Sequence, residues 1–444
     1  MPSRSDQLHS YQFAVQRVVS AMAAHESNPS RPPGRRAGLA LLAGVLAAAL
    51  GLAGFAVWGL LQPGGSTKWR SGSAVIVEKE SGAKFVYLDG VLHPVANYAS
   101  ALLIVGAAKT MQVARRSLAG APRGPLLGIP GAPDALPRRR DLLAGPWAVC
   151  GSVGSDRSTV VVGSAPRGDP LGADGALVST PDGAVHLLWQ GRRARVREPE
   201  TVLGMLVWGT PAPVAPAVVN ALAAAADIGR VPVPGRGQPF GPVPGARIGQ
   251  VFLVDGRQHA VALAAGLAPT TAFQAALVLG DPATVERVGQ TAPTALSPGE
   301  YARLPRTAFP GSWIGLPDEV PRPVRIGAAE AVCASSVPGG EVVVSAAQPR
   351  GAPIAGSAPG LASEVRLPPG RGVLATARAA PGAEAGVVYL VTDLGVRYPL
   401  ASSDVLPMLG FSGARPVPLP AEVLALLPTG PGLYPQDARR VVGS

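Results

Sequence analysis

The chain has 444 residues and a formal net charge of +11, and its 15% of charged residues is well below the roughly one quarter found in average soluble proteins. Its arginines are scattered, apart from Arg138–Arg140 and Arg192–Arg193, and aromatic residues, at 5%, are not interleaved with them. This pattern argues against a nucleic-acid-binding protein and favours a basic domain that faces an anionic envelope polymer or a membrane surface.

Residues 1–36 form a short tail that contains a predicted helix. In DQLHSYQFAVQRVVSAMAAHESN, apolar residues recur at helical spacing: Leu8, Tyr11, Val15, Val18, Val19 and Met22. Pro29, Pro32 and Pro33 then end the pattern. Such a helix either lies on the membrane surface or docks onto a partner. Because few basic residues line its polar face, we favour docking.

The run Ala37–Leu61 predicts a transmembrane helix. It has 25 residues without charge or proline, and a helix of that length spans roughly 37 Å, enough to cross a ~30 Å hydrocarbon core. A cleaved signal peptide is the alternative, but the run is too long and no small-x-small cleavage motif directly follows it. A buried core helix is disfavoured because the run contains no polar side chain. We therefore expect an uncleaved single-pass anchor.

Charge sets the expected orientation of this anchor. Residues 1–36 carry five arginines against Asp6 and Glu26, a net charge of +3. Basic residues next to a first membrane helix tend to stay in the cytoplasm, although Lys68 and Arg70 weaken the asymmetry here. We predict an inner-membrane protein with a cytoplasmic N-terminus and a large C-terminal domain in the periplasm-like envelope space.

Beyond the anchor, four segments share one pattern of a strand, a glycine turn, a second strand and a short apolar helix. The hairpins are Phe85–Val95, His186–Val196, Val251–Val261 and Tyr389–Leu400, with structural turn glycines Gly90, Gly191, Gly256 and Gly395. The helices are expected to end at Gly106, Gly209, Gly280 and Gly410, since glycine suits a left-handed C-cap. A lone hairpin cannot bury its apolar face, so each unit needs its helix and its neighbours.

Two further hairpins contain the cysteines. Around Cys150 the chain reads WAVCGSVGSDRSTVVV, and around Cys333 it reads AEAVCASSVPGGEVVV, so each cysteine lies on the first strand of a predicted hairpin. Outside the cytoplasm a disulfide between them is expected. It would close a long loop and stabilise the fold by about 5 kcal/mol in the chain-entropy model. Two unrelated buried thiols are the alternative.

The order of these pieces predicts an α+β fold with a single N-terminal transmembrane helix and four ββα-type repeats around a central β core with pseudo-twofold symmetry. Pro/Gly-rich connectors separate the pieces, among them APRGPLLGIPGAPDALP and VPVPGRGQPFGPVPGA. The expected domains are the tail (1–36), the transmembrane helix (37–61), repeats 1 to 4 (72–140, 175–240, 245–320 and 370–440) and the disulfide-linked core (145–170 and 327–350).

No catalytic, cofactor-binding or metal-binding residues are predicted. Lys109–Thr110 are not preceded by the glycines that a phosphate-binding loop needs, and no nucleophile elbow or cysteine–histidine metal pattern occurs. His93 and His259 occupy the same repeat position, where the other repeats have Ala194 and Tyr398. We therefore interpret both histidines as packing residues, with a shared ligand or pH-sensing role as the alternative.

The chain resembles the EccB family, a core component of the type VII (ESX) secretion machinery. The resemblance covers nearly the whole chain. It is carried by the HSYQFAVQRVVSAM helix, the single anchor, YLDGVLHPVANYASALLIVG, the LGIPGAPDALP segment and the WAVC and AAEAVC core motifs.

The resemblance implies a periplasm-facing domain of four repeats around a disulfide-bridged core. It also implies assembly with the partners EccC, EccD and EccE near the mycosin protease. We expect a structural subunit that scaffolds or gates the export path and whose periplasmic domain associates with copies of itself. The alternatives are an ATPase, a label often given to the family although this sequence contains no recognisable nucleotide-binding motif, and a cell-wall-binding module.

Overall fold

The structure is a computed structural model that describes residues 3–24, 34–61, 67–327, 330–336, 342–349, 353–355, 358, 360–378 and 386–443. The chain divides into two compact units, one containing residues 1–68 and 113–120 and the other containing residues 69–112 and 121–444. The long helices belong to the first unit, and the sheets belong to the second. The prediction of a mixed α+β fold with a long apolar N-terminal helix is confirmed.

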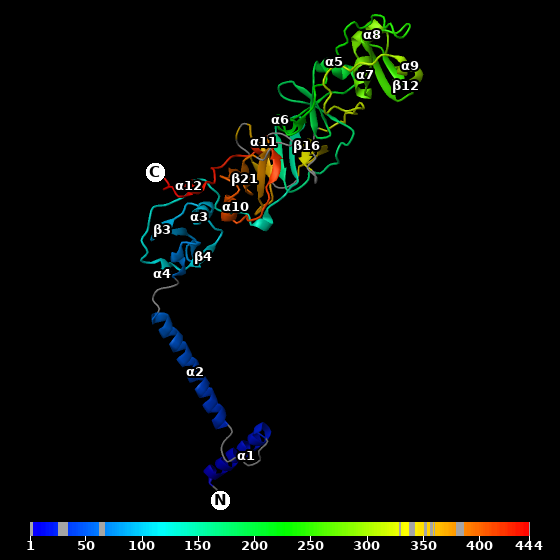
Figure 1. Ribbon diagram of the computed structural model, residues 1–444. Coiled ribbons are helices and arrows are strands. Elements are labelled where there is room, and N and C mark those ends of the chain that lie inside the picture. The colour runs from blue at the N-terminus through cyan, green and yellow to red at the C-terminus, as the bar shows by residue number, and fades with distance from the viewer. Residues whose placement is uncertain are drawn as a thin grey trace. The chain divides into compact units, whose positions relative to one another are not determined.

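The apolar helix α2 (Gly34–Leu61) is continuous over its 28 residues (Figure 1). Its segment Gly38–Trp58 has a mean hydropathy of 2.3, none of it is buried within the protein, and it is long enough to cross a membrane. A helix of this composition that no protein surface covers is suited to lipid.

The tail helix α1 (Arg4–Ala24) forms where the sequence predicts it. Its apolar side chains are exposed, with Tyr11 at 71% and Met22 at 79%. The predicted proline break at residues 29–33 lies outside the described residues. The short α4 (Arg115–Leu118) is grouped with the same unit.

In the second unit, four small sheets each contain an antiparallel meander of three strands and a later strand beside the first. Their orders are β3-β2-β1-β4, β10-β7-β8-β9-β11, β14-β13-β12-β15 and β22-β21-β20-β23. The later strand runs parallel to the first in the pairs β7–β10, β12–β15 and β20–β23. The strands are β1 (Val75–Glu78), β2 (Lys84–Leu88), β3 (Val91–Pro94), β4 (Thr110–Val113), β7 (Ala176–Ser179), β8 (Val185–Trp189), β9 (Arg192–Val196), β10 (Ala212–Pro213), β11 (Ala223–Ala224), β12 (Val251–Val254), β13 (Gln258–Leu263), β14 (Gly266–Thr270), β15 (Thr294–Leu296), β20 (Val373–Arg378), β21 (Val388–Val391), β22 (Arg397–Pro399) and β23 (Val417–Pro420).

A helix follows the third strand of each meander: α3 (Tyr98–Val105), α5 (Pro199–Met205), α7 (Ala272–Leu279) and α10 (Val405–Met408). Further short helices are α6 (Pro216–Asn220), α8 (Pro282–Val288), α9 (Pro298–Arg303), α11 (Ala421–Ala425) and α12 (Pro435–Ala438), with 3-10 turns η1 (Lys68–Ser71) and η2 (Arg139–Asp141).

The fifth sheet has the order β17-β16-β5-β6-β19-β18. Its strands come from distant parts of the chain: β5 (Trp147–Ser152), β6 (Ser158–Val162), β16 (Ala331–Ser336), β17 (Val342–Ala347), β18 (Ile354–Ala355) and β19 (Glu364–Arg366). The two cysteine-containing hairpins, β5–β6 and β16–β17, lie side by side with their first strands antiparallel. We call this the central sheet.

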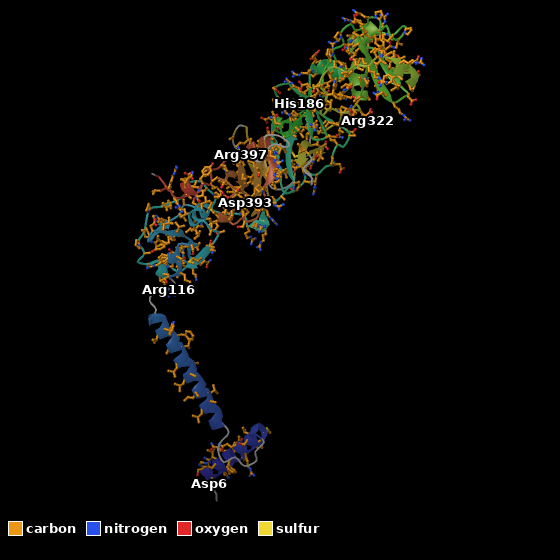
Figure 2. The ribbon with its side chains drawn as sticks, viewed as in Figure 1. Asp6, Arg116, His186, Arg322, Asp393 and Arg397 are labelled. Atoms are coloured by element: carbon orange, nitrogen blue, oxygen red, sulfur yellow. A yellow bond between two sulfur atoms is a disulfide. The ribbon has the colours of Figure 1, made fainter. Side chains whose placement is uncertain are left out.

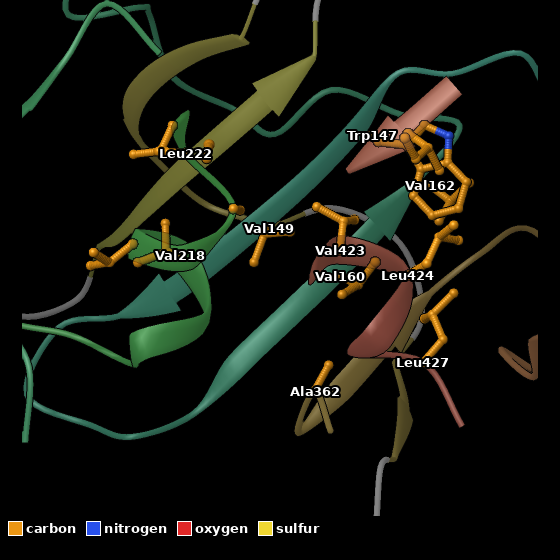
Figure 3. Packing of buried hydrophobic residues seen from close by; sticks show 14 of the residues in the cluster. Trp147, Val149, Val160, Val162, Val218, Leu222, Ala362, Val423, Leu424 and Leu427 are labelled. Carbon is orange, nitrogen blue, oxygen red and sulfur yellow. The ribbon is translucent and has the colours of Figure 1, made fainter. Parts of the chain in front are cut away.

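Buried apolar clusters join the sheets. One lies on the central sheet and includes Trp147, Val160, Val218 and Leu424, with α6 and α11 over the strands (Figure 3). A second contains residues of α3, β21 and α10, and a third contains residues of β8, β13 and α7. Each small sheet therefore buries its apolar face against a neighbour, as expected for units that cannot stand alone.

The prediction that each repeat helix ends at a left-handed glycine is right for α3, whose cap Gly106 has φ 73°. It is wrong for α7, because Gly280 is right-handed at φ −74°. A Cβ on Gly280 would lie 2.3 Å from the carbonyl oxygen of Met205, so glycine is needed here for close packing against the end of α5. It is also wrong for α5, which is capped by Leu206 and followed by the left-handed Val207, because Gly209 is not left-handed. It is right for α10, since Gly410 has φ 89° directly after the cap residue Leu409.

The third hairpin is also displaced by one strand from the alignment that the sequence predicts. Gly90, Gly191 and Gly395 join the second and third strands of their meanders, whereas Gly256 joins the first and second, β12 and β13. The extra strand β14 then precedes α7. Asp-Gly occurs both at Gly90, between the second and third strands, and at Gly256, between the first and second strands. The turn residues alone therefore do not show which two strands a turn connects.

The predicted connectors are packed segments of the fold. In APRGPLLGIPGAPDALP, Leu127 and Ile129 are buried, and the side chain of Asn97 donates to the carbonyl of Ile129 at 2.7 Å. In VPVPGRGQPFGPVPGA, Phe240 is 2% exposed. Proline and glycine here fix specific turns against the core.

Candidate functional site

The central sheet is bridged by the predicted disulfide. Cys150 on β5 and Cys333 on β16 lie directly opposite each other, with Cα atoms 4.0 Å apart and an S–S bond across 183 positions of sequence. Opposite residues on antiparallel strands point to the same face, which brings the two sulfur atoms together. The disulfide is buried, since both cysteines are at most 1% exposed.

The two faces of this sheet are different because side chains alternate along a strand. The disulfide face carries small residues, including Ala148, Ala331 and Ala347, which leave room for the bridge. The other face carries Trp147 and Val149 in the large apolar cluster under α6 and α11 (Figure 3). The bridge thus joins β5 to β16, two strands of the sheet that are buried over all but their last residue.

Ionic contacts secure the side of the sheet next to β6. Glu364 on β19 pairs with Arg157 and with Arg366, at 2.8 and 2.9 Å. The hydrogen bond from Arg366 holds the pKa of Glu364 below its ordinary value, and Arg157 contributes further. Glu364 is therefore a carboxylate at neutral pH that ties the β5–β6 loop to a strand more than 200 positions away.

The four predicted turn glycines all have positive φ, between 67° and 84°, but they have different surroundings. A Cβ on Gly191 would lie 2.1 Å from the carbonyl oxygen of Val342 on β17, and one on Gly395 would lie 3.2 Å from the side chain of Val365 on β19. A Cβ on Gly90 or Gly256 would have no atom of the described residues within 4 Å beyond its own chain neighbours. Two of the four turns therefore dock against strands of the central sheet, a distinction that the sequence pattern does not contain.

The structure places the remaining sequence candidates apart from any catalytic arrangement. Lys109 and Thr110 come after α3, whereas a phosphate-binding loop precedes its helix. The Thr110 hydroxyl is hydrogen-bonded to Tyr98 at 2.9 Å. The His93 ring lies against Gly124, with Nδ1 3.1 Å from the Pro125 carbonyl. Across the described ranges, no group of three or more histidine, cysteine or acidic side chains could hold a metal ion.

One pocket was not anticipated from the sequence. It has a volume of about 670 Å³ and lies beside β8 and β9, where its lining includes His186, Arg193, Arg195 and Arg197. The sequence RRARVR contains three arginines two positions apart, and residues two apart on a strand share a face, so this run could have indicated a basic face. We call this the β9 pocket.

The chain is similar to known proteins along its whole length. Residues 1–443 match the family model described as "Type VII secretion system ESX-1, transport TM domain B". The curated "ESX-3 secretion system ATPase EccB3" of Mycolicibacterium smegmatis is 31% identical over 480 residues, covering 97% of this chain and 89% of the relative. Its counterpart of the same name in Mycobacterium tuberculosis is 29% identical, covering 97% and 88%.

The chain is also similar to solved structures of type VII secretion components. A chain in the "Structure of an intact ESX-5 inner membrane complex" superposes with a TM-score of 0.67 at 26% identity, covering 100% of this chain and 96% of that one. A chain in the "Structure of EccB3 dimer from the ESX-3 core complex" gives a TM-score of 0.66 at 28% identity, covering 83% and 100%.

Proposed function

Since the chain belongs to the EccB family of the type VII secretion system, we propose that it is a membrane-anchored structural subunit of an ESX inner membrane complex. The observation that carries this function is the match of the entire chain to a subunit of the intact ESX-5 inner membrane complex. Its sheets are joined by buried apolar clusters, and a buried disulfide bridges the central sheet. Such a body is suited to scaffolding or gating the export path.

The proposed topology has residues 1–36 in the cytoplasm and residues 67–443 in the periplasm-like envelope space. Its support is the net charge of the tail, the exposed apolar helix α2 and the likeness of 87% of the chain to a subunit of the periplasmic ESX-5 assembly. Protease treatment of spheroplasts tests it. A C-terminal tag should be digested and an N-terminal tag protected, and the reverse pattern would overturn the orientation.

The proposal includes an internal repeat around a pseudo-twofold core. The support is the shared order of the four small sheets, a three-strand meander with the next strand beside its first, and the side-by-side placement of the two cysteine hairpins. The boundaries 72–140, 175–240, 245–320 and 370–440 are the proposed repeats, and 145–170 with 327–350 is the proposed core.

The proposed partners are EccC, EccD, EccE and the mycosin protease, with self-association of the outer domain. A relative occurs as a dimer in the ESX-3 core complex. Affinity purification through a tag on this chain, from gently solubilised membranes, tests the assignment. Recovery of the other core components at fixed ratios supports membership, and recovery of this chain alone would contradict it.

ATP hydrolysis is a second candidate, because the relatives' names carry it. Its test is ATP turnover by the purified full chain across a size-exclusion peak. Turnover that follows the protein and is abolished by one substitution would establish it, while turnover that separates from the protein would dismiss it.

A further inference from the structure

The sheet that contains β8 and β9 has two different faces. Leu187 and Ala194 point into one apolar cluster, and Leu188 belongs to another. On the Leu188 face, the register places His186 opposite Arg195 and Leu188 opposite Arg193. This face is apolar at one end and basic at the other, and the basic end forms the floor of the β9 pocket.

The three arginines of the pocket differ in their hydrogen-bond and ion-pair partners. Arg197 is paired with Asp227, with Nε 2.6 Å from the carboxylate. Arg193 donates to the amide oxygen of Asn220 at 3.2 Å, but its buried Nε has no partner among the described residues. Arg195 is exposed, and its side chain makes no hydrogen bond or ion pair with the part of the chain that the structure describes. A guanidinium group has only N–H donors and a positive charge, so its unpaired N–H groups are suited to binding an anion.

His186 is the buried ionisable residue of the pocket, whose lining also includes the buried Val219. Figure 2 labels the place of His186 in the chain. This residue is 8% exposed, and its Nδ1 has no hydrogen-bond partner within the described ranges. Burial lowers the pKa of this imidazole, and the positive charges of Arg193 and Arg195 lower it further. An unpaired buried polar atom costs free energy unless a ligand or a solvent molecule satisfies it.

We propose that the β9 pocket binds the phosphate ester of a sugar, with the phosphate held by Arg195 and His186. The three arginines outweigh Asp182 and Asp227 by one positive charge, and a protonated His186 would raise the excess to two, matching a phosphate dianion. The volume of about 670 Å³ exceeds what a phosphate alone needs, and Pro216 and Val219 supply an apolar wall for a sugar ring. This site is independent of the structural role proposed above.

Binding of the dianion is coupled to proton uptake by His186. The charged groups facing this ring are Arg193 and Arg195 on β9, Asp182 in the β7–β8 turn and Asp227 after β11. A dianion placed between the arginines stabilises the imidazolium and raises its pKa relative to the free protein. Affinity therefore increases as pH falls between those two pKa values.

Equilibrium dialysis of the detergent-purified full chain with radiolabelled ribose 5-phosphate tests the site. We expect saturable binding that uncharged ribose does not displace and that Arg195→Gln weakens at least tenfold. Arg192→Gln is the matched control, because Arg192 is the neighbour of Arg193 and so lies on the opposite face of β9; its affinity should stay within twofold of wild type. Displacement by ATP at much lower concentration than by unlabelled ribose 5-phosphate would identify a nucleotide as the phosphate ester.

A second readout separates a ligand-binding role for His186 from a packing role. Between pH 8 and pH 6 the affinity of wild type should rise more than that of His186→Gln, and using one probe for both proteins cancels the titration of the probe itself. The site is overturned by equal binding to wild type and Arg195→Gln, by the absence of saturable binding at 10 mM ribose 5-phosphate, or by identical pH profiles for wild type and His186→Gln.

Discussion

At Gly191 the missing side chain allows a hairpin turn to approach the backbone of another sheet. The carbonyl of Val342 occupies the space that a Cβ would take. The turn also has φ 72°, which L-residues rarely adopt. Gly191 is therefore required both by the close contact with Val342 and by its positive φ, whereas Gly90 is required only by its positive φ.

Substitution of Gly191 should separate these constraints. Gly90→Ala carries the conformational penalty of a left-handed alanine, about 1–2 kcal/mol. Gly191→Ala carries that penalty plus displacement of β17, so we expect at least about 3 kcal/mol of destabilisation. Chemical denaturation of the two variants measures the difference, and equal losses would show that the contact with Val342 contributes nothing.

A buried ion-pair cluster lies at the start of α8, which follows the helix of the third small sheet. Asp281 is 1% exposed, pairs with Arg230 and Arg236 at 2.8 Å each, and accepts a hydrogen bond from the N–H of Ala283 at the start of α8. Burial alone would raise the pKa of Asp281, but the hydrogen bonds from Arg230 and Ala283 and the charge of Arg236 together hold it below its ordinary value.

Asp281→Asn keeps the helix cap but leaves Arg236, itself 6% exposed, without its counter-charge. We expect a loss of about 3–5 kcal/mol at neutral pH. Because the folded-state pKa is lowered, the contribution of the carboxylate is complete above the unfolded value near 4 and is lost as pH falls through the folded value.

Thermal denaturation from pH 7 to pH 3 checks this prediction. The difference in Tm between wild type and Asp281→Asn should be constant at neutral pH and should shrink below about pH 4. Asp89→Asn, in an exposed turn at φ 49°, is the control and should show no such convergence. A difference that does not change with pH would contradict the ionic role of Asp281.

At the scale of the element, the central sheet is the feature that the sequence predicted best. The two cysteine hairpins were recognisable because Ala-Val-Cys, a polar turn and Val-Val-Val occur twice. The strand β19, which joins the same sheet beside β6, carried no comparable signal because it is three residues long and pairs with a strand about 200 positions away.

Removal of the disulfide should destabilise the second unit without changing its fold. Cys150→Ala/Cys333→Ala deletes a cross-link across 183 positions, and the chain-entropy model gives a loss of about 5 kcal/mol. Urea denaturation measures it. Val161→Ala, in the same buried cluster, is the control for lost packing and should cost about 1–2 kcal/mol; an equal loss in both proteins would mean that the cross-link itself contributes little.

Helix caps and connectors were the elements that sequence reasoning described least well. Glycine marks a helix end for two reasons, a left-handed cap at Gly106 and close packing at Gly280, and the sequence does not distinguish them. Likewise, Pro/Gly-rich segments read as connectors, yet Ile129 and Phe240 anchor two of them in the core. Tertiary contacts decide both cases, and a single sequence does not contain them.

For the whole molecule, one apolar run was sufficient to predict the long apolar helix α2, and the repeated hairpin patterns were sufficient to predict the mixed α+β fold of the second unit. The family followed from motifs spread along the entire chain, and residues 1–443 match its model. The β9 pocket was missed because its residues come from β8, β9, α6 and the segment after β11, and only the three arginines of β9 form a pattern along the sequence.

The most direct measurement is a cryo-electron microscopy reconstruction of the membrane complex purified through a tag on this chain. We predict that residues 67–443 lie on the outer side of the membrane, joined to one transmembrane helix per copy and in contact with other subunits or with a second copy. A reconstruction that places these residues on the cytoplasmic side, or a preparation in which the chain is a solitary monomer, would contradict the account.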